Sequence, residues 1–145
     1  MILNSILIAD SCTMGRFGLK ALISQQDIFK VIGEAEDKAE LFEAIDEFSP
    51  QLIIIDFLSD GFDIETIVSL KRDYPSINIL AITAVQRSNV FVSAMRAGVD
   101  SYIKKSCSIE EVVEAIDSTI KGSSFFCGKI LESIRKDSID VNDIE

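Results

Sequence analysis

A carboxylate closes the most apolar run of the chain, because Asp56 follows the Leu-Ile-Ile-Ile of residues 52–55. That run is continuous rather than alternating, which is typical of a strand buried on both faces of a parallel sheet. Asp10 closes a second strand-like run, residues 3–9. Ligands of open α/β sheets bind at the carboxyl edge of the strands, so both acids are predicted to lie where a ligand binds.

Two further strand-like runs end in polar groups: Thr83 follows residues 77–82, and Lys105 ends residues 99–105. Two neighbouring carboxylates repel, and oxygen ligands favour Mg²⁺ or Mn²⁺ as the cation that relieves the repulsion. A carboxylate held in this way can attack phosphorus and form an aspartyl phosphate, with the hydroxyl and the amine bonding the phosphoryl oxygens. Each residue alone also has a plain explanation, since Thr83 could satisfy backbone groups and Lys105 could be solvated. Their placement at four strand ends favours a phosphate-handling site.

The strand-like runs alternate with helical patterns along the whole chain. This alternation predicts an α/β fold with a parallel sheet covered on both faces. Five strands fit the doubly wound, flavodoxin-like order 2-1-3-4-5, which places strands 1 and 3 side by side and makes Asp10 and Asp56 neighbours. The remaining strand is predicted at residues 31–35, and the helices at 13–25, 38–48, 63–73, 88–97 and 108–122.

Several helix ends carry recognisable signals. Thr13 and Ser88 are predicted to cap the first and fourth helices. The sequence from Ser108 to Glu111 has the S-x-x-E form of a capping box, which opens the fifth helix. Beyond it, residues 123–145 are predicted to form a short helix at 128–136 followed by an acidic tail or linker.

Composition excludes several classes of function. The 145 residues carry a net charge of −10, so a basic footprint for nucleic acid is absent. The absence of histidine removes Ser-His-Asp and Cys-His catalysis and histidine metal centres. No apolar stretch is long enough to span a bilayer, and the first residues lack a signal-peptide pattern. A single domain without a membrane partner is therefore expected.

The three cysteines, Cys12, Cys107 and Cys127, are odd in number and far apart in sequence. That spacing argues against a disulfide framework or a zinc site and favours a reducing, cytoplasmic compartment. Cys12 lies close to the predicted site and could be a reactive thiol. Because no histidine is available to activate it, a packing role is the preferred interpretation.

The residues at the strand ends sit in blocks that resemble the signatures of response-regulator receiver domains, over residues 1–122. Two further blocks, Ser49-Pro50-Gln-Leu and Ala94-Met-Arg-Ala-Gly98, are similar to the subfamily that carries a LuxR/NarL-type helix-turn-helix. The signature blocks are Ile6-Leu-Ile-Ala-Asp10, Ile53-Ile-Ile-Asp56, Ala81-Ile-Thr-Ala84 and Ala97-Gly-Val-Asp-Ser-Tyr-Ile-Lys-Lys105.

The resemblance implies a two-component signalling module whose Asp56 accepts a phosphoryl group from a sensor histidine kinase. It also implies a Mg²⁺ cofactor, no enzymatic activity of its own, and DNA binding only through an effector domain that this sequence does not include. The other implied roles are Asp10 and the backbone carbonyl of Leu58 as metal ligands, Thr83 as the switch hydroxyl, Tyr102 as the switch aromatic, and Lys105 as the phosphate-pairing lysine.

Two positions depart from the family pattern. Ser11 replaces the second of two adjacent acids that normally touches the metal, and Ser59-Asp60 replaces the usual Met-Pro after the phosphoacceptor. A serine hydroxyl is a poorer Mg²⁺ ligand than a carboxylate, so weak metal binding is expected.

These departures leave a second hypothesis open, a degenerate receiver that docks or dimerises without phosphorylation. The helix at 88–97 is apolar around more than one face, which suggests a partner surface for a homodimer unless the final tail covers it. A third class, a flavodoxin-like cofactor protein or an aspartyl-phosphate phosphatase, is disfavoured. The loop 11–15 is not a glycine-rich phosphate cradle, and neither Asp10 nor Asp56 has an acid two residues on.

Overall fold

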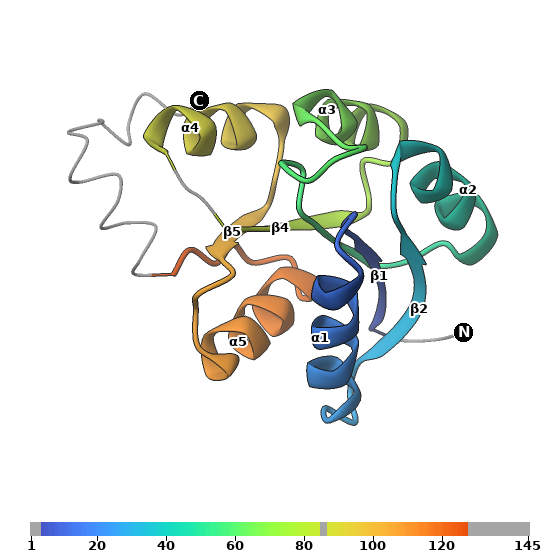
Figure 1. The fold of residues 1–145 in the computed structure, drawn as a ribbon, viewed down its shortest axis with the longest axis vertical. Coiled ribbons are helices and arrows are strands. Elements are labelled where there is room, and N and C mark those ends of the chain that lie inside the picture. Colours follow the sequence, from blue (N-terminus) through green and yellow to red (C-terminus); the bar gives the residue numbers. More distant parts are fainter. Residues whose placement is uncertain (1–3, 85–86, 128–145) are drawn as a thin grey trace.

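The computed structural model describes residues 4–84 and 87–127. Five parallel strands form one sheet in the order β2-β1-β3-β4-β5, which confirms the predicted topology. Helices α1 and α5 cover one face of this sheet, and α2, α3 and α4 cover the other (Figure 1). The elements are β1 (Ser5–Ala9), α1 (Thr13–Ser24), β2 (Lys30–Ala35), α2 (Lys38–Phe48), β3 (Leu52–Ile55), α3 (Ile64–Asp73), β4 (Asn78–Thr83), α4 (Ser88–Ala97), β5 (Ser101–Lys104) and α5 (Ile109–Ile120).

The central strands are buried because helices lie on both sides of them. Every residue of β1 and β3 is buried, as the continuous apolar runs predict. Burial of each isoleucine or leucine side chain contributes about 1.5–3 kcal/mol, so these two strands anchor the sheet. In the register of β1 against β3, Ala9 lies opposite Ile55. The next residue of each strand is an aspartate, so the pairing of two fully buried strands sets the separation of the two acids.

Two predicted helix caps are wrong by one residue. The residues at the N-cap positions of α1 and α4 are Cys12 and Arg87, and neither makes a side-chain capping hydrogen bond. Thr13 and Ser88 are the first helical residues instead. The capping box that opens α5 is confirmed.

β5 is shorter than predicted. It spans four residues, because the carboxylate of Asp100 accepts the backbone N–H of Ile79 at 2.8 Å before regular strand pairing begins. The same carboxylate forms an ion pair with Lys71 at 2.7 Å. Although Lys105 lies just beyond β5, its N–H still donates to the carbonyl of Thr83 at 2.8 Å, which keeps Lys105 beside the end of β4.

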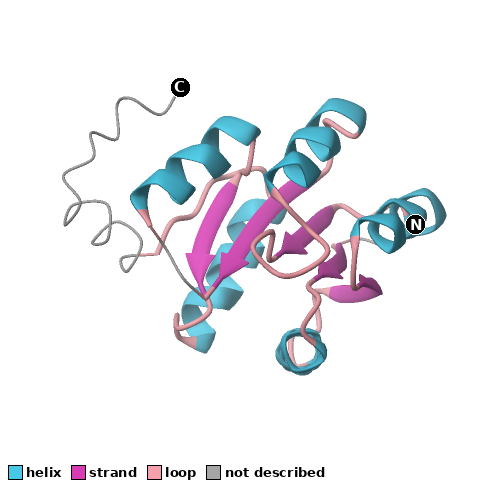
Figure 2. Cartoon of the chain, turned by 45° about the horizontal axis from the view of Figure 1, so that its top comes forward, coloured by secondary structure: helices cyan, strands magenta, loops and turns pink. Residues whose placement is uncertain are grey.

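After α5 the chain returns along the outer edge of β5 (Figure 2). The N–H of Tyr102 donates to the carbonyl of Phe125 at 3.1 Å, and the N–H of Phe125 donates to the Ser101 hydroxyl at 2.9 Å. Tyr102 and Phe126 form a parallel bridge. Residues 123–127, the return segment, therefore cover an edge that would otherwise present unpaired backbone groups. The predicted helix at 128–136 and the acidic tail lie outside the described residues.

The surface of α4 is less apolar than the sequence suggested. Phe91 is buried, and Val90, Val92 and Met95 are half-buried. The return segment covers part of this helix, because the rings of Phe91 and Phe126 meet edge to face at 5.7 Å. Large apolar side chains are exposed instead on α1 and at the start of α5. Along residues 4–84 and 87–127, no helix has the length and apolar character needed to cross a bilayer.

We predict opposite effects for two glycine-to-alanine substitutions. Gly98 ends α4 with φ +113°, and an added Cβ would lie 2.7 Å from Cγ of Lys71. Gly98→Ala should lower the free energy of unfolding by about 1–2 kcal/mol, because a side chain disfavours that backbone conformation. Gly18 lies inside α1 with open space around it, so Gly18→Ala should raise the free energy of unfolding by about 0.5–1 kcal/mol. Urea unfolding of both variants measures the difference, and equal effects would contradict it.

Candidate functional site

The carboxyl ends of β1 and β3 place two buried acids side by side, as predicted. Asp10 is 2% exposed and Asp56 is 8% exposed. Lys105 lies between them, with Nζ at 2.9 Å from Oδ2 of Asp10 and 2.8 Å from Oδ2 of Asp56. Buried carboxylates need such a partner, because an unpaired charge in the interior is costly. One amine therefore bridges two acids that are 46 residues apart in sequence.

The second oxygen of each acid is held by the backbone that follows it. Oδ1 of Asp10 accepts the N–H of Cys12 at 2.9 Å, and Oδ1 of Asp56 accepts the N–H of Leu58 at 3.0 Å. Each aspartate thus bonds to a backbone group two residues on, the arrangement of an Asx-turn. These turns fix both carboxylates in orientation, so that Oδ2 of each acid faces Lys105.

The charge of Lys105 is stabilised by the two acids. Burial alone lowers the pKa of this lysine, but hydrogen bonds and charge from Asp56 and Asp10 outweigh that effect and raise the pKa above its ordinary value. The amine is therefore positively charged at neutral pH. Two carboxylates and one ammonium leave a net charge of −1 in the cluster, which still favours a cation beside it.

Thr83 and Tyr102 form a buried pair next to the acids. The two hydroxyl oxygens lie 2.8 Å apart, and either can donate. Tyr102 is fully buried, with its ring stacked on Phe91 at 5.7 Å and edge-on to Phe57 at 5.8 Å. Burial raises the pKa of Tyr102 to about 12, although the hydrogen bond with Thr83 opposes this rise and the charge of Asp56 adds to it. The structure therefore brings all four strand-end residues and Tyr102 into one region.

Sequence reasoning missed Arg16, whose side chain holds the backbone of Asp10. This buried residue of α1 donates to the backbone carbonyl of Asp10 at 2.7 Å. It also forms ion pairs with Glu34 at 3.1 Å and Glu36 at 2.8 Å. The sequence carried a partial signal for this cluster, because Asp10, Glu34, Glu36 and Arg16 lie near the ends of adjacent predicted elements. Nothing in the sequence shows that the guanidinium points inward.

The two departures from the family pattern meet in the structure. The hydroxyl of Ser59 donates to the carbonyl of Asp56 at 2.8 Å and accepts the N–H of Ser11 at 3.2 Å. The loop after β3 is thereby tied to the loop after β1 without a rigid turn residue. Asp60 is exposed. Gly15 is a further residue that sequence reasoning missed, because a Cβ there would lie only 2.9 Å from Oδ2 of Asp10.

A hollow of about 290 Å³ lies beside Asp10, between α1 and the start of α5. Asp10 and Lys105 line it together with apolar side chains, among them Met14 and Ile109. The site is therefore open to molecules from solution on this side. Cys12 is exposed, so its interpretation as a packing residue is wrong.

The family model for the response regulator receiver domain matches residues 6–117. The chain belongs to the response-regulator receiver domain family. Receiver domains are signalling modules switched by phosphorylation, and the predicted resemblance is confirmed. The matched range includes Asp10, Asp56, Thr83 and Lys105.

Known relatives of this receiver domain are LuxR-family regulators. The response regulator protein VraR of Staphylococcus aureus (strain NCTC 8325) is 33% identical over 131 residues, which cover 90% of this chain and 63% of that protein. A LuxR-family two-component response regulator from Aurantimonas has a solved structure with 25% identity and a TM-score of 0.86, covering 95% of this chain and 99% of that one. The isolated receiver domain of RcsB from Salmonella enterica, solved with the phosphomimetic BeF₃⁻, shares the fold at 21% identity and a TM-score of 0.84, covering 90% and 98% of the two chains.

We predict that the buried phenol makes the receiver domain sensitive to alkali. The pKa of Tyr102 rises from 10.0 to about 12 on folding, so its contribution to stability is present below pH 10 and is lost as the pH rises to about 12. Tyr102→Phe should lower the free energy of unfolding by about 1 kcal/mol at neutral pH through the lost hydrogen bond. The same variant should flatten the loss of stability above pH 10.

Urea unfolding across that pH range and the ultraviolet band of tyrosinate measure both effects. Tyr74→Phe is the matched control, because Tyr74 bonds to Asp46 at the surface and the variant keeps the late-titrating phenol. An equally steep alkaline loss in Tyr102→Phe would contradict the assignment.

Proposed function

We propose that this receiver domain is switched by phosphorylation of Asp56, with a sensor histidine kinase as the phosphodonor. The observation that carries the proposal is the position of Lys105, whose amine bridges Asp56 and Asp10 at 2.8 and 2.9 Å. This pairing holds the Asp56 carboxylate in a fixed place and supplies a positive charge where phosphoryl oxygens would bind.

The geometry suits an attack on phosphorus by Asp56. A carboxylate oxygen of Asp56 forms a bond to the phosphorus as the bond from phosphorus to the donor breaks, and the donor leaves with that electron pair. Lys105 then pairs with a phosphoryl oxygen in place of the carboxylate oxygen. The Thr83 hydroxyl donates its single proton to another phosphoryl oxygen while it accepts the proton of Tyr102. Phosphorylation would thus fix the direction of a hydrogen bond that is otherwise reversible.

Receiver domains generally bind Mg²⁺ at the phosphorylation site, and the donor set here fits a hard cation. Asp10, Asp56 and the backbone carbonyl of Leu58 would hold the ion, which would neutralise negative charge on the phosphoryl group. Lys105 already neutralises part of the charge of the two acids, and Ser11 adds none. Weak Mg²⁺ binding follows from this charge balance.

We predict that Asp56 is the residue that takes up the phosphoryl group. Incubation with acetyl phosphate and Mg²⁺, followed by mass spectrometry of peptides, should place a single label on Asp56 and none on Asp10. Asp56→Ala should carry no label. Lys105→Met should fold but label more slowly by about tenfold or more, because one positioned charged group is worth this much in phosphoryl transfer. Label that persists in Asp56→Ala would overturn the mechanism.

We predict that Ser11→Asp tightens Mg²⁺ binding and speeds labelling of Asp56. The change adds a third negative charge and a better ligand, and the loop stays tied because the Ser11 bond to Ser59 uses the backbone N–H. Titration of Mg²⁺ into wild type, Ser11→Asp and Asp60→Ala measures the effect. If Asp60 substitutes for the missing acid, wild type binds tightly and Asp60→Ala abolishes binding. Tight binding that neither change alters would contradict the charge argument.

A degenerate receiver that docks without phosphorylation is the second candidate. Exposed apolar side chains favour it: Met14 is 83% exposed, Phe17 is 74% exposed, and Ile109 is 61% exposed. Such side chains on α1 and at the start of α5 are suited to a protein partner, and a homodimer is the simplest one. Unlabelled Asp56 together with a stable dimer in light scattering would favour this candidate over the first.

We extend the proposal to a longer protein that would contain this receiver domain. The matched residues span 63% of the length of VraR, and RcsB has been solved as dimers bound to DNA. We propose that this receiver domain controls a DNA-binding effector domain in the same way, acts in transcription regulation, and has no enzymatic activity of its own. Cytoplasmic location agrees with the free state of Cys12, Cys107 and Cys127. The folded unit would extend through the return segment to Cys127, beyond the boundary at residue 122.

A further inference from the structure

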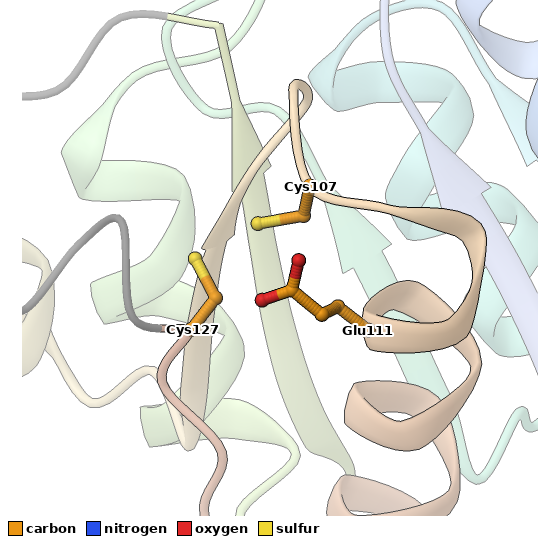
Figure 3. Close-up of side chains that lie close together, drawn as sticks. All are labelled: Cys107, Glu111 and Cys127. Atoms are coloured by element: carbon orange, nitrogen blue, oxygen red, sulfur yellow. The ribbon is translucent and has the colours of Figure 1, made fainter.

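Two cysteines that are 20 residues apart in sequence meet beyond the carboxyl end of β5. Cys107, Glu111 and Cys127, the thiol–carboxylate cluster, place their ligand atoms within 4.8 Å of one another. Figure 3 shows the three side chains pointing toward a common centre, from the loop after β5, the first turn of α5 and the return segment. The cysteine spacing alone argued against a zinc site, because this contact depends on where the return segment lies.

Local structure fixes each member of the cluster. The N–H of Cys107 donates to the carbonyl of Lys104 at 3.1 Å, which forms the turn after β5. Oε1 of Glu111 accepts the N–H and the hydroxyl of Ser108 in the capping box, at 3.1 and 3.2 Å. A carboxylate offers about four lone-pair positions, so these bonds orient Glu111 and leave positions for a cation. Cys127 is 1% exposed and is held by the pairing of the return segment with β5.

The electrostatics of the cluster favour a cation. Burial, the neighbouring Cys127 and the charge of Glu111 together raise the pKa of Cys107 to about 12. The thiolate form of Cys107 is therefore disfavoured in the absence of a cation. A divalent cation at the centre of the cluster removes this penalty and releases the thiol protons to solvent.

We propose that the thiol–carboxylate cluster is a binding site for Zn²⁺ or a similar thiophilic divalent cation. The thiolates of Cys107 and Cys127 and the carboxylate of Glu111 supply three ligands, and water supplies the fourth. Tetrahedral Zn²⁺ with bonds of about 2.3 Å to sulfur holds its ligand atoms about 3.7 Å apart. Ligand atoms that now lie within 4.8 Å of one another would have to approach by about 1 Å, which side-chain rotation can supply. The bound ion would join the return segment to the first turn of α5 and so hold Phe125 and Phe126 along β5.

Zinc titration of the reduced full chain tests the proposal. The protein is treated with a chelator and a phosphine reductant, kept in excess Mg²⁺ to occupy the acids at Asp10 and Asp56, and titrated with Zn²⁺ against a chromophoric chelator. About one equivalent should bind and raise the melting temperature by several degrees. Co²⁺ should give thiolate-to-cobalt absorption at the same stoichiometry.

Three variants define the ligands. Cys107→Ser and Cys127→Ser should each lose both the stoichiometric binding and the cobalt absorption. Glu111→Gln should weaken binding by about tenfold or more, and it should keep the capping box, since glutamine serves at that position. Circular dichroism of each variant without metal separates loss of a ligand from loss of the fold.

Two matched controls should bind like wild type: Cys12→Ser removes the cysteine outside the cluster, and Glu110→Gln removes the adjacent acid. Four outcomes would overturn the proposal: no saturable Zn²⁺ binding by folded, fully reduced protein; binding retained in a folded Cys127→Ser; binding lost in Cys12→Ser; or a disulfide joining Cys107 to Cys127 in protein purified without reductant. Labelling of Asp56 is a separate measurement, so failure here leaves the phosphoacceptor role untouched.

Discussion

The site depends on the two ion pairs that Lys105 makes with Asp10 and Asp56. Without the amine, two buried carboxylates would face each other across adjacent strands, and both would lose their compensating charge. With it, each acid keeps one oxygen toward the lysine and the other toward its own backbone turn. Both carboxylates are therefore fixed in place before any ligand binds, and in the proposed role of Asp56 this reduces the reorganisation that phosphoryl transfer requires.

This contact exists because the hydrophobic core decides where the strands end. The buried runs of β1 and β3 pair in register, so the aspartates that follow them emerge together. β4 and β5 pair so that Thr83 lies opposite Lys104, which leaves Lys105 one residue beyond the sheet. A shift of one residue in either pairing would send these side chains to the other face. The positions of the polar side chains are thus set by apolar packing that lies outside the site.

The sequence predicted those features that depend on strand periodicity and on the order of elements. Asp10, Asp56, Thr83 and Lys105 were found because strand ends are visible in the apolar pattern, and Tyr102 because the surrounding block resembles a known family. Features that depend on side-chain direction were not found. Arg16 reads as an ordinary helix residue until its guanidinium is seen on the carbonyl of Asp10.

Contacts that join distant loops were equally hidden from sequence reasoning. Ser59 ties the loop after β3 to the loop after β1 with a pair of hydrogen bonds that no spacing rule indicates. The approach of Cys127 to Cys107 depends on a return segment that pairs with β5 through backbone groups. Backbone pairing carries almost no sequence signal, because every residue offers the same N–H and carbonyl groups.

Tyr102 is held at both ends, with its hydroxyl on Thr83 and its backbone N–H on Phe125 of the return segment. Because Tyr102 contacts both the site and the return segment, changes at one are thermodynamically linked to changes at the other. In the proposed role of Asp56, any free energy with which its phosphorylation strengthens or weakens the contact between Tyr102 and the return segment acts back with equal size on the phosphorylation equilibrium. In a longer protein, a domain that pulls on the return segment would then change how readily Asp56 keeps its phosphoryl group.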